Sequence, residues 1–349
     1  MSAGLHQITD LVARGFVKNA DAAALNEIAS RYAVAITPHL ADLIDAENPH
    51  DPIARQFIPN LREAETRPEE LVDPIGDGVY SPVEGIVHRY PDRVLLKLLH
   101  VCPVYCRFCF RREMVGPGAE QVLSSAALDK ALAYIADHSE IWEVILTGGD
   151  PLALSPRRLD DVLQRLARID HVKILRIHTR VPAVDPGKIS AELVQVLTSA
   201  RQTLYVALHA NHARELGDAA AQALARLVDA GIPLVSQTVL LRGVNDDLAS
   251  LSALMRRFVE LRVKPYYLHQ ADLAPGTSHF RVDLDLARAL VADLRAQVSG
   301  LCQPAFVLDI PGGYGKVPIG PDHVTGQGVL DHQGRPHAYP DPATGKPDF

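Results

Sequence analysis

From residue 94 onward the chain alternates regularly between short apolar runs and amphipathic stretches. Short runs rich in Val, Ile and Leu are typical of buried strands, whereas apolar residues repeating every three or four positions are typical of helices. The predicted strands are 94–99, 143–148, 172–179, 203–210, 233–241 and 264–272, and the predicted helices are 125–138, 155–169, 190–200, 213–231, 248–262 and 282–298. Strict alternation predicts parallel strands joined by right-handed helical crossovers.

The two ends of the chain differ from this alternating region. Residues 1–63 have helix-like apolar spacing, and residues 65–93 are rich in Pro, Asp, Glu and Gly, which predicts a long connection. Near the other end, a last apolar stretch precedes a polar tail that we expect to be partly ordered at best from about Thr325. The predicted divisions are an N-terminal helical region with its linker, a core and a C-terminal segment, at 1–75, 85–300 and 301–349.

Six strand–helix units are too few for a complete eightfold barrel. The pattern predicts an α/β fold in which an open or partial barrel competes with the alternative of a doubly wound sheet. In both architectures ligands bind at the carboxyl ends of the strands. We therefore expect the chemistry in the loops that follow the strands.

Composition narrows the classes of function by exclusion. The 349 residues are 47% hydrophobic, carry a net charge of −7 and include only four cysteines. A chain of this length buries a core that is stable without disulfides, so a disulfide scaffold is excluded. Runs of Lys or Arg that would indicate a nucleic-acid partner do not occur, and no window of about 18 apolar residues indicates a membrane span. An N-terminus without an apolar leader predicts a cytoplasmic protein.

Three of the four cysteines lie within eight residues, directly after the first predicted strand. Cys102, Cys106 and Cys109 form a C-x3-C-x2-C pattern, and closely spaced thiolates suit an iron–sulfur cluster or zinc. A structural zinc ion requires four ligands, and a fourth would have to come from Cys302 or His100, which lack the usual paired spacing. A four-iron cluster held by three thiolates leaves one iron free to bind a ligand. The remaining alternative is three small buried side chains.

The segment CPVYCRFC resembles the signature of the radical S-adenosylmethionine (SAM) superfamily, and Phe108 before the last cysteine fits that pattern. The resemblance implies an α/β fold with a partial (β/α)6 TIM-like barrel and a [4Fe-4S] cluster on the three cysteines. It also implies a reductant for the cluster, and SAM bound to the fourth iron and cleaved to a 5′-deoxyadenosyl radical. The segment LTGGDPL resembles the second motif of the superfamily, in which Gly148 and Gly149 let the backbone approach SAM. Asp150 belongs to this motif, and its alternative role is a local cap.

A second candidate site is the glycine-rich loop Asp309–Pro318, which reads DIPGGYGKVP and contains Lys316. A Walker A loop would need glycine at Ile310 and serine or threonine at Val317, so binding of a nucleoside triphosphate is excluded. A lysine in such a loop can instead form a Schiff base with pyridoxal phosphate (PLP). The alternative is a solvated surface turn.

Together, the cysteine motif and the lysine loop resemble the lysine 2,3-aminomutases, in which the lysine of a PGGGGK loop binds PLP; here the loop reads PGGYGK. The resemblance runs from about His88 to Pro318 and includes HRYPDRVLLK, CPVYCRFCFRR, SQTVLLRGVND and YYLHQADLAPGTSHFR. It implies a C-terminal PLP-binding segment and an isomerase that moves the α-amino group of L-lysine to the β-carbon, giving β-lysine.

The resemblance assigns substrate-binding roles to three residues. Arg111, two positions after the third cysteine, stands where the family binds the α-carboxylate of the substrate, and a planar guanidinium suits that group. Asp272 and Asp309 stand where the family binds the ε-ammonium of lysine. Because an isolated buried ammonium is costly, a lysine substrate requires such a carboxylate pair. A glutamate substrate would be repelled by it.

The resemblance also places cofactor-binding residues. Arg89, Tyr90 and Arg93 match the HRYPDR segment, whose arginines hold the PLP phosphate in the family. The alternative is that these arginines pair with Asp92 or with nearby glutamates. The remaining candidates share a place at the ends of later strands: Gln237 near PLP, and Arg180, with His178, Thr179 and His209, near SAM.

The chain departs from the classical lysine 2,3-aminomutases at its C-terminus, because Cys302 has no companions to rebuild their interfacial zinc site. A homo-oligomer is therefore an open expectation. The length resembles the branch that makes (R)-β-lysine for elongation factor P. Three hypotheses stand: an L-lysine 2,3-aminomutase, an aminomutase serving elongation factor P or acting on another amino acid, and a zinc-stabilised binding protein without enzymatic activity.

Overall fold

One nine-stranded sheet forms the centre of the computed structural model, which describes residues 4–116, 122–325, 328–331 and 334–338. Its strands are β1 (Ile86–Tyr90), β2 (Arg93–Leu99), β3 (Glu143–Gly148), β4 (Ile174–Thr179), β5 (Thr203–His209), β6 (Leu234–Leu240), β7 (Val263–Gln270), β8 (Ala305–Ile310) and β9 (Gly315–Pro318). They lie side by side in chain order. A doubly wound sheet reverses its order at a switch point, so that alternative is wrong and the partial barrel is confirmed.

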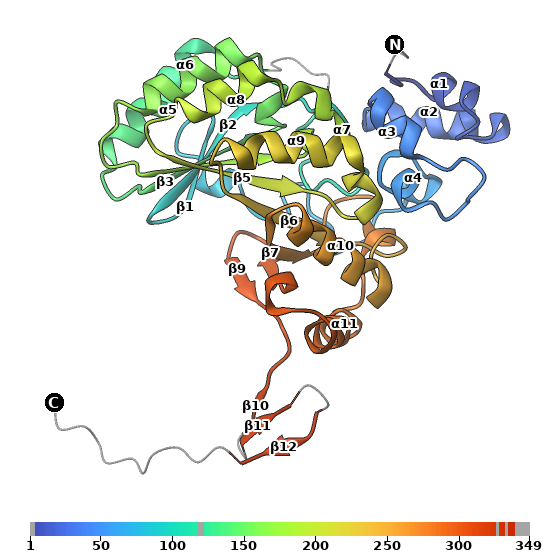
Figure 1. Ribbon diagram of the computed structural model, residues 1–349. Coiled ribbons are helices and arrows are strands. Elements are labelled where there is room, and N and C mark those ends of the chain that lie inside the picture. The colour runs from blue at the N-terminus through green and yellow to red at the C-terminus, as the bar shows by residue number, and fades with distance from the viewer. Residues whose placement is uncertain (1–3, 117–121, 326–327, 332–333, 339–349) are drawn as a thin grey trace.

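Strands β2 to β8 pair in parallel, and β1 and β9 add to the two edges in antiparallel register. Helices fill the crossovers and cover the outer side of the curved sheet (Figure 1). These helices are α5 (Ser125–Asp137), α6 (Pro156–Leu166), α7 (Val181–Val184), α8 (Ala191–Thr198), α9 (Asp218–Asp229), α10 (Leu248–Glu260) and α11 (Leu284–Gln297). Ser155 caps α6 by accepting the Arg158 N–H, with Pro156 in the first turn.

The structure adds strands that the sequence pattern did not predict. Strand β1 lies inside the predicted connection 65–93. It pairs with β2 through a tight hairpin in which Tyr90 and Arg93 are partners and Pro91 and Asp92 form the turn. The segment around this strand is rich in proline and acidic residues, a composition typical of loops. A strand of only five residues is therefore not recognised from the composition. The last apolar stretch forms β8, so seven strands rather than six run in parallel.

The N-terminal region is helical, as predicted, with α1 (Ile8–Ala13), α2 (Ala22–Arg31), α3 (Pro38–Leu43) and α4 (Pro52–Phe57). It lies beside α7 (Figure 1), and the hydroxyl of Thr37 donates to the carbonyl of Val184 at the end of α7. One continuous cluster of buried apolar side chains runs from Leu5 to Phe306. The predicted division into three segments therefore stays a prediction.

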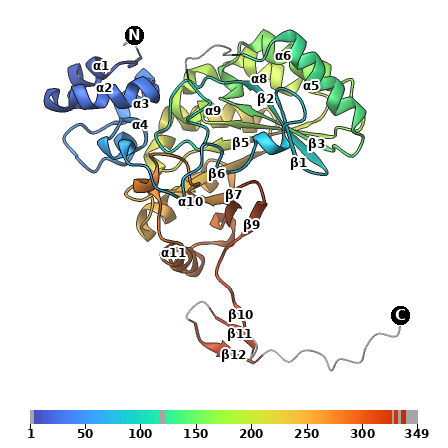
Figure 2. The ribbon, with the colours of Figure 1, turned by 180° about the vertical axis from the view of Figure 1, so that it is seen from behind.

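The C-terminal part described by the structure leaves the main body. Strands β10 (Val324–Thr325), β11 (Gly328–Leu330) and β12 (Pro336–His337) form a separate small sheet (Figure 2). The predicted partly ordered tail thus contains short strands, and residues 339–349 lie outside the described residues.

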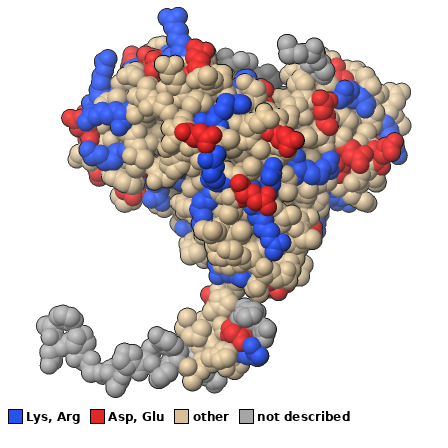
Figure 3. Space-filling model, viewed as in Figure 1, with Lys and Arg blue, Asp and Glu red and all other residues tan. Residues whose placement is uncertain are grey.

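Charges of both signs are interspersed on the face shown in Figure 3. Among the residues that the structure describes, no helix has the length and apolar character needed to cross a bilayer.

Candidate active site

A cavity of about 750 Å³ lies inside the curved sheet and is lined by residues from all nine of its strands. Its volume is within the range of small-molecule sites. The cavity brings together every residue that the sequence predicted for the site. These are Arg89, Tyr90, Arg93, Cys102, Cys106, Cys109, Arg111, Gly148, Gly149, Asp150, Arg180, Gln237, Asp272, Asp309 and Lys316.

The three cysteines of the loop after β2 are free thiols that line this cavity. Burial raises the pKa of all three, that of Cys106 to about 11, so a bound metal centre is needed to hold them as thiolates. In the described part of the chain, no three His, Cys, Asp or Glu side chains form a site for a single metal ion. A four-iron cluster binds each thiolate through a different iron, which suits cysteines that do not converge on one point.

The N-terminal region holds the cysteine loop in place. Arg107, which stands between two of the cysteines, is 1% exposed and forms a bidentate ion pair with Glu63 at 2.6 to 3.1 Å. Arg112 donates to the same carboxylate, and its guanidinium lies 3.5 Å from the ring centre of Tyr32. Although burial opposes ionisation, the two arginines lower the pKa of Glu63. No local sequence pattern predicts the contact between Arg107 and Glu63, because these residues are 44 positions apart.

Gly148 and Gly149 let the end of β3 press against the cysteine loop. A Cβ on Gly149 would lie 2.0 Å from the carbonyl oxygen of Val101, and one on Gly148 would lie 2.3 Å from that of Leu99. The N–H of Gly149 donates to the Leu99 carbonyl at 2.5 Å. Both glycines are therefore required by contact between backbones. Their predicted contact with SAM stays a prediction.

Asp150 joins the ends of β3 and β4. It accepts the N–H of Leu152, which is the local cap considered as its alternative role, and it also accepts the Thr179 hydroxyl and the Arg180 N–H, both at 2.7 Å. Burial raises the pKa of Asp150 despite these hydrogen bonds.

The side chain of Arg180 reaches the cysteine loop. Its Nη1 lies 3.4 Å from the sulfur of Cys106, and its Nη2 donates to Glu215 at 2.5 Å and to Gln56 at 2.6 Å. These contacts place a cation beside a predicted cluster ligand.

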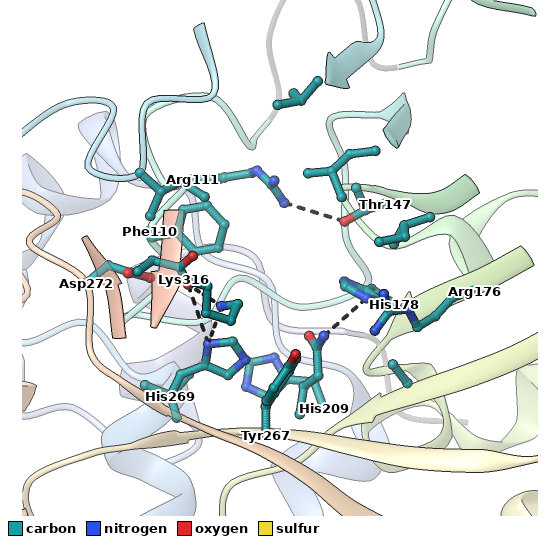
Figure 4. A pocket seen from close by; sticks show the side chains of 18 of the residues that line it. Phe110, Arg111, Thr147, Arg176, His178, His209, Tyr267, His269, Asp272 and Lys316 are labelled. Carbon is teal, nitrogen blue, oxygen red and sulfur yellow. Dashed lines mark hydrogen bonds and ion pairs between the residues drawn. The ribbon is translucent and has the colours of Figure 1, made fainter. Parts of the chain in front are cut away.

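Arg111 is held by a buried carboxylate that the sequence analysis did not identify. Its Nε and Nη2 donate to Oδ2 of Asp77 at 3.0 and 2.8 Å, and its Nη1 lies 3.4 Å from the Thr147 hydroxyl (Figure 4). Arg89 lies 3.4 Å from the other oxygen of Asp77. Asp77 therefore links the predicted arginines for the substrate and for the PLP phosphate. Asp77 lies in the segment 65–93, whose composition predicts a connection, so no sequence pattern marked Asp77 as a functional residue.

Lys316 lies on β9, in register with Asp309 on β8. Its ammonium pairs with the Asp309 carboxylate and lies 3.2 Å from Nδ1 of His269 on β7 (Figure 4). Its backbone N–H donates to the hydroxyl of Tyr90 at 2.7 Å. The side chain is 21% exposed and lines the cavity, so the alternative of a solvated surface turn does not describe it.

Asp272 follows β7 and lines the same cavity as Lys316. Burial and the charge of Asp309 raise the pKa of Asp272 to about 7. Burial also opposes ionisation of Asp309, but the neighbouring His269 ring, 3.7 Å away, and the charge of Lys316 hold the pKa of Asp309 well below its usual range. The site thus contains one carboxylate with a cationic partner and one that would gain from binding another cation.

The other predicted residues have partners within the chain. Arg93 pairs with Asp92 at 2.8 Å and stacks 4.0 Å from the ring centre of Tyr90, which is the pairing considered as its alternative. The side-chain amide of Gln237 lies 3.1 Å from Nε2 of His178. His209 lies 3.2 Å from the Asn211 side chain. Roles of these residues in cofactor binding stay predictions.

Comparisons with known proteins agree with this geometry. The sequence profile of the Radical SAM superfamily matches residues 96–254, and together with the barrel and the cysteine loop it defines a radical SAM protein. L-lysine 2,3-aminomutase of Clostridium subterminale is 40% identical over 294 residues, which are 84% of this chain and 70% of that protein. The chain belongs to the lysine 2,3-aminomutase family of radical SAM enzymes, and it is therefore an isomerase.

Two further similarities complete the comparison. Glutamate 2,3-aminomutase of Clostridioides difficile is 34% identical over 305 residues, covering 87% of this chain and 72% of that protein. A radical SAM methyltransferase from Sphaerobacter thermophilus superposes with a TM-score of 0.45 at 20% identity, covering 64% of this chain and 68% of that one. Family membership leaves no support for the non-enzymatic hypothesis.

The residues present fit the cofactors of the family, which are a [4Fe-4S] cluster, SAM and PLP. The cysteine loop supplies three soft donors for the cluster. The same cavity contains a lysine amine with a partly buried carboxylate and a partly buried imidazole beside it, which suits attachment of an aldehyde.

Proposed function

We propose that the protein is an L-lysine 2,3-aminomutase that forms β-lysine with a [4Fe-4S] cluster, SAM and PLP. The observation that carries the proposal is the placement of two carboxylates, Asp272 and Asp309, in one cavity with Arg111 and Lys316. A guanidinium suits the α-carboxylate of an amino acid. A pair of carboxylates suits a second cationic group at the other end of the substrate, which is the charge pattern of lysine.

The ion pair between Lys316 and Asp309 explains how the charge of Asp309 is balanced before the substrate binds. In the structure the lysine ammonium neutralises Asp309. Once the amine of Lys316 engages PLP, its hydrogen bonds to Asp309 weaken, and Asp309 and Asp272 together can accept the ε-ammonium of lysine. We expect substrate binding to favour the ionised form of Asp272, because a nearby cation lowers the pKa of a carboxyl group.

The remaining chemistry divides between cofactors and protein. When bound, the cluster and SAM supply a radical that removes a hydrogen atom from the substrate, and PLP supplies the aldehyde that carries the migrating nitrogen. The protein orients the substrate between Arg111 and the two aspartates. Apolar wall residues such as Ile145, Ala207 and Val307 keep this space free of competing groups.

Anaerobic reconstitution tests the proposal. The protein is loaded with iron, sulfide and PLP, reduced, and incubated with SAM and L-lysine. We expect β-lysine, detected by chromatography after derivatisation. A preparation with confirmed cluster content and bound PLP that converts no lysine would overturn the proposal.

A second candidate is an aminomutase for another amino acid, because a glutamate 2,3-aminomutase is among the similar proteins. A panel of lysine, ornithine, glutamate and alanine distinguishes the two. We expect Asp272→Asn and Asp309→Asn each to weaken turnover of lysine strongly, whereas a glutamate enzyme would keep or gain activity. Formation of the (R) product would agree with the elongation factor P hypothesis, whose test is transfer of that product to the factor.

A further inference from the structure

His269 occupies a central place beside the lysine amine. It lies on β7, next to the β8–β9 pair that carries Asp309 and Lys316. Its Nδ1 is 3.2 Å from Nζ of Lys316 and 3.7 Å from Oδ2 of Asp309. Figure 4 shows the imidazole directed at the lysine, with a dashed line joining the two side chains.

The hydrogen bonds define which ring nitrogen is available. When the ammonium of Lys316 donates to Nδ1, the neutral ring carries its hydrogen on Nε2. A proton taken up on Nδ1 would then face the Asp309 carboxylate, 3.7 Å away. Nε2 is buried and has no hydrogen-bond partner among the described residues. Burial lowers the pKa of His269, despite the opposing effect of Asp309, so the ring is neutral near pH 7 and its Nδ1 can accept a proton.

Other titratable or charged groups also border this space. They are Asp309 from β8, Asp272 after β7, Tyr267 on β7, Tyr90 on β1, His178 on β4, His209 on β5 and Arg111 from the cysteine loop. Asp309 is a weak proton acceptor, because its neighbours keep it ionised. The ring centre of Tyr267 is 5.4 Å from Nζ, and Tyr90 binds only the backbone N–H of Lys316. Asp272 is the one competing base of matching pKa, and the experiment below separates it from His269.

We propose that His269 is the catalytic base and acid for Lys316, taking a proton from its ammonium when PLP is attached and returning it when substrate releases the lysine. The inference rests on the proposed function, because it requires PLP on Lys316. It goes further by assigning a role to a residue for which neither the sequence pattern nor the family resemblance gave one.

The proton balance is complete without another reactant. A proton moves from Nζ to Nδ1, which leaves a neutral amine and an imidazolium facing Asp309. The lone pair of the amine would form a bond to the aldehyde carbon. The aldehyde oxygen would leave as water after taking two protons, one from the amine nitrogen and one from the His269 imidazolium. The nitrogen would keep the third hydrogen of the original ammonium, and the His269 ring would be neutral again. In the reverse direction the imidazolium, formed from the incoming substrate ammonium, protonates the released lysine amine.

Attachment of PLP, measured without SAM or turnover, tests the proposal. The rate is followed by absorbance between pH 6 and 10, and borohydride reduction with mass spectrometry confirms Lys316 as the attachment site. His269→Asn keeps an acceptor near the position of Nδ1 but cannot take up a proton. We expect its rate at pH 7 to fall at least tenfold, to recover at alkaline pH and to rise with added imidazole.

Two further variants make each outcome decisive. His171→Asn is a matched control, because His171 does not line the cavity and its ring is hydrogen-bonded to the Ile135 carbonyl. Its profile should equal that of the wild type. His269→Gln replaces His269→Asn if the latter does not fold. An unchanged profile in the folded variant, or the same shift in Asp272→Asn instead, would overturn the role of His269. Absence of attachment in the wild type would overturn the proposed function itself.

Discussion

The proposed role of Asp272 in binding the substrate would make that binding depend on pH. Its pKa of about 7 reflects burial first and the neighbouring Asp309 charge second. In the protein without substrate, the folded chain binds this proton more tightly than the unfolded chain does, because the pKa of Asp272 is higher in the fold. Proton binding therefore stabilises the folded state. The contribution to stability is present below the unfolded pKa and is lost as pH rises through about 7.

We expect lysine to bind more tightly as pH rises through 7, because the ionised form of Asp272 pairs with the ε-ammonium. The dissociation constant, measured by spectral titration of the PLP-loaded enzyme, should rise about tenfold for each pH unit below the pKa. Asp272→Asn should bind weakly with no such dependence. A variant that keeps the wild-type slope would assign the titration to another group.

At the level of elements, the junction between β3 and the cysteine loop has no space for a side chain. Gly149→Ala would put a Cβ 2.0 Å from a backbone oxygen, so the strand end and the loop must separate. We expect loss of most of the bound iron and a clear drop in melting temperature, measured by iron assay and thermal unfolding. Gly187→Ala is the matched control, since its Cβ would meet nothing within 4 Å. Equal behaviour of the two variants would contradict this account.

The buried ion pair between Arg107 and Glu63 makes a second prediction. Breaking such a pair by removing one partner costs about 3–5 kcal/mol, because the other charge stays buried. Arg107→Ala should therefore lower the free energy of unfolding by an amount of this order and reduce cluster content. Arg31→Ala is the control, because Arg31 pairs with Glu113 near the surface. Denaturant unfolding measures both, and a loss below about 1 kcal/mol for Arg107→Ala would contradict the prediction.

The sequence predicted the elements whose signals are local. Strand β3 has the predicted bounds 143–148, because a β-branched run between two amphipathic helices is unambiguous. Strand β1 was missed, because a five-residue strand beside Pro91 has the composition of a turn. Asp77 and Glu63 were missed because their importance comes from arginines that are 34 and 44 residues away in sequence. Gly148 and Gly149 were predicted to belong to the site, where they would let the backbone approach SAM. The structure shows a further reason for glycine at both positions, which is close contact with the backbone of the cysteine loop.

On the scale of the whole molecule, the small sheet β10–β12 is separate from the body. The ion pair between Arg288 and Asp322 that precedes it is exposed, and such pairs contribute little to stability. A chain ending at Pro321 should keep its cluster content and its melting temperature within about 2 °C. A larger decrease, measured by thermal unfolding, would show that this segment stabilises the body, and a smaller particle in size-exclusion chromatography would show that it holds copies together.

The hydrogen bond from the Lys316 N–H to Tyr90 has a consequence for the working temperature of the enzyme. It joins β9 to β1, the two outermost strands of a sheet that is otherwise open between them. Thermal fraying begins at the edges of a sheet, where the fewest contacts hold the backbone. Here those edges carry Lys316 and Tyr90, two residues of the proposed PLP site. Heat should therefore release PLP before the barrel melts, and the enzyme would lose activity while most of its structure persists.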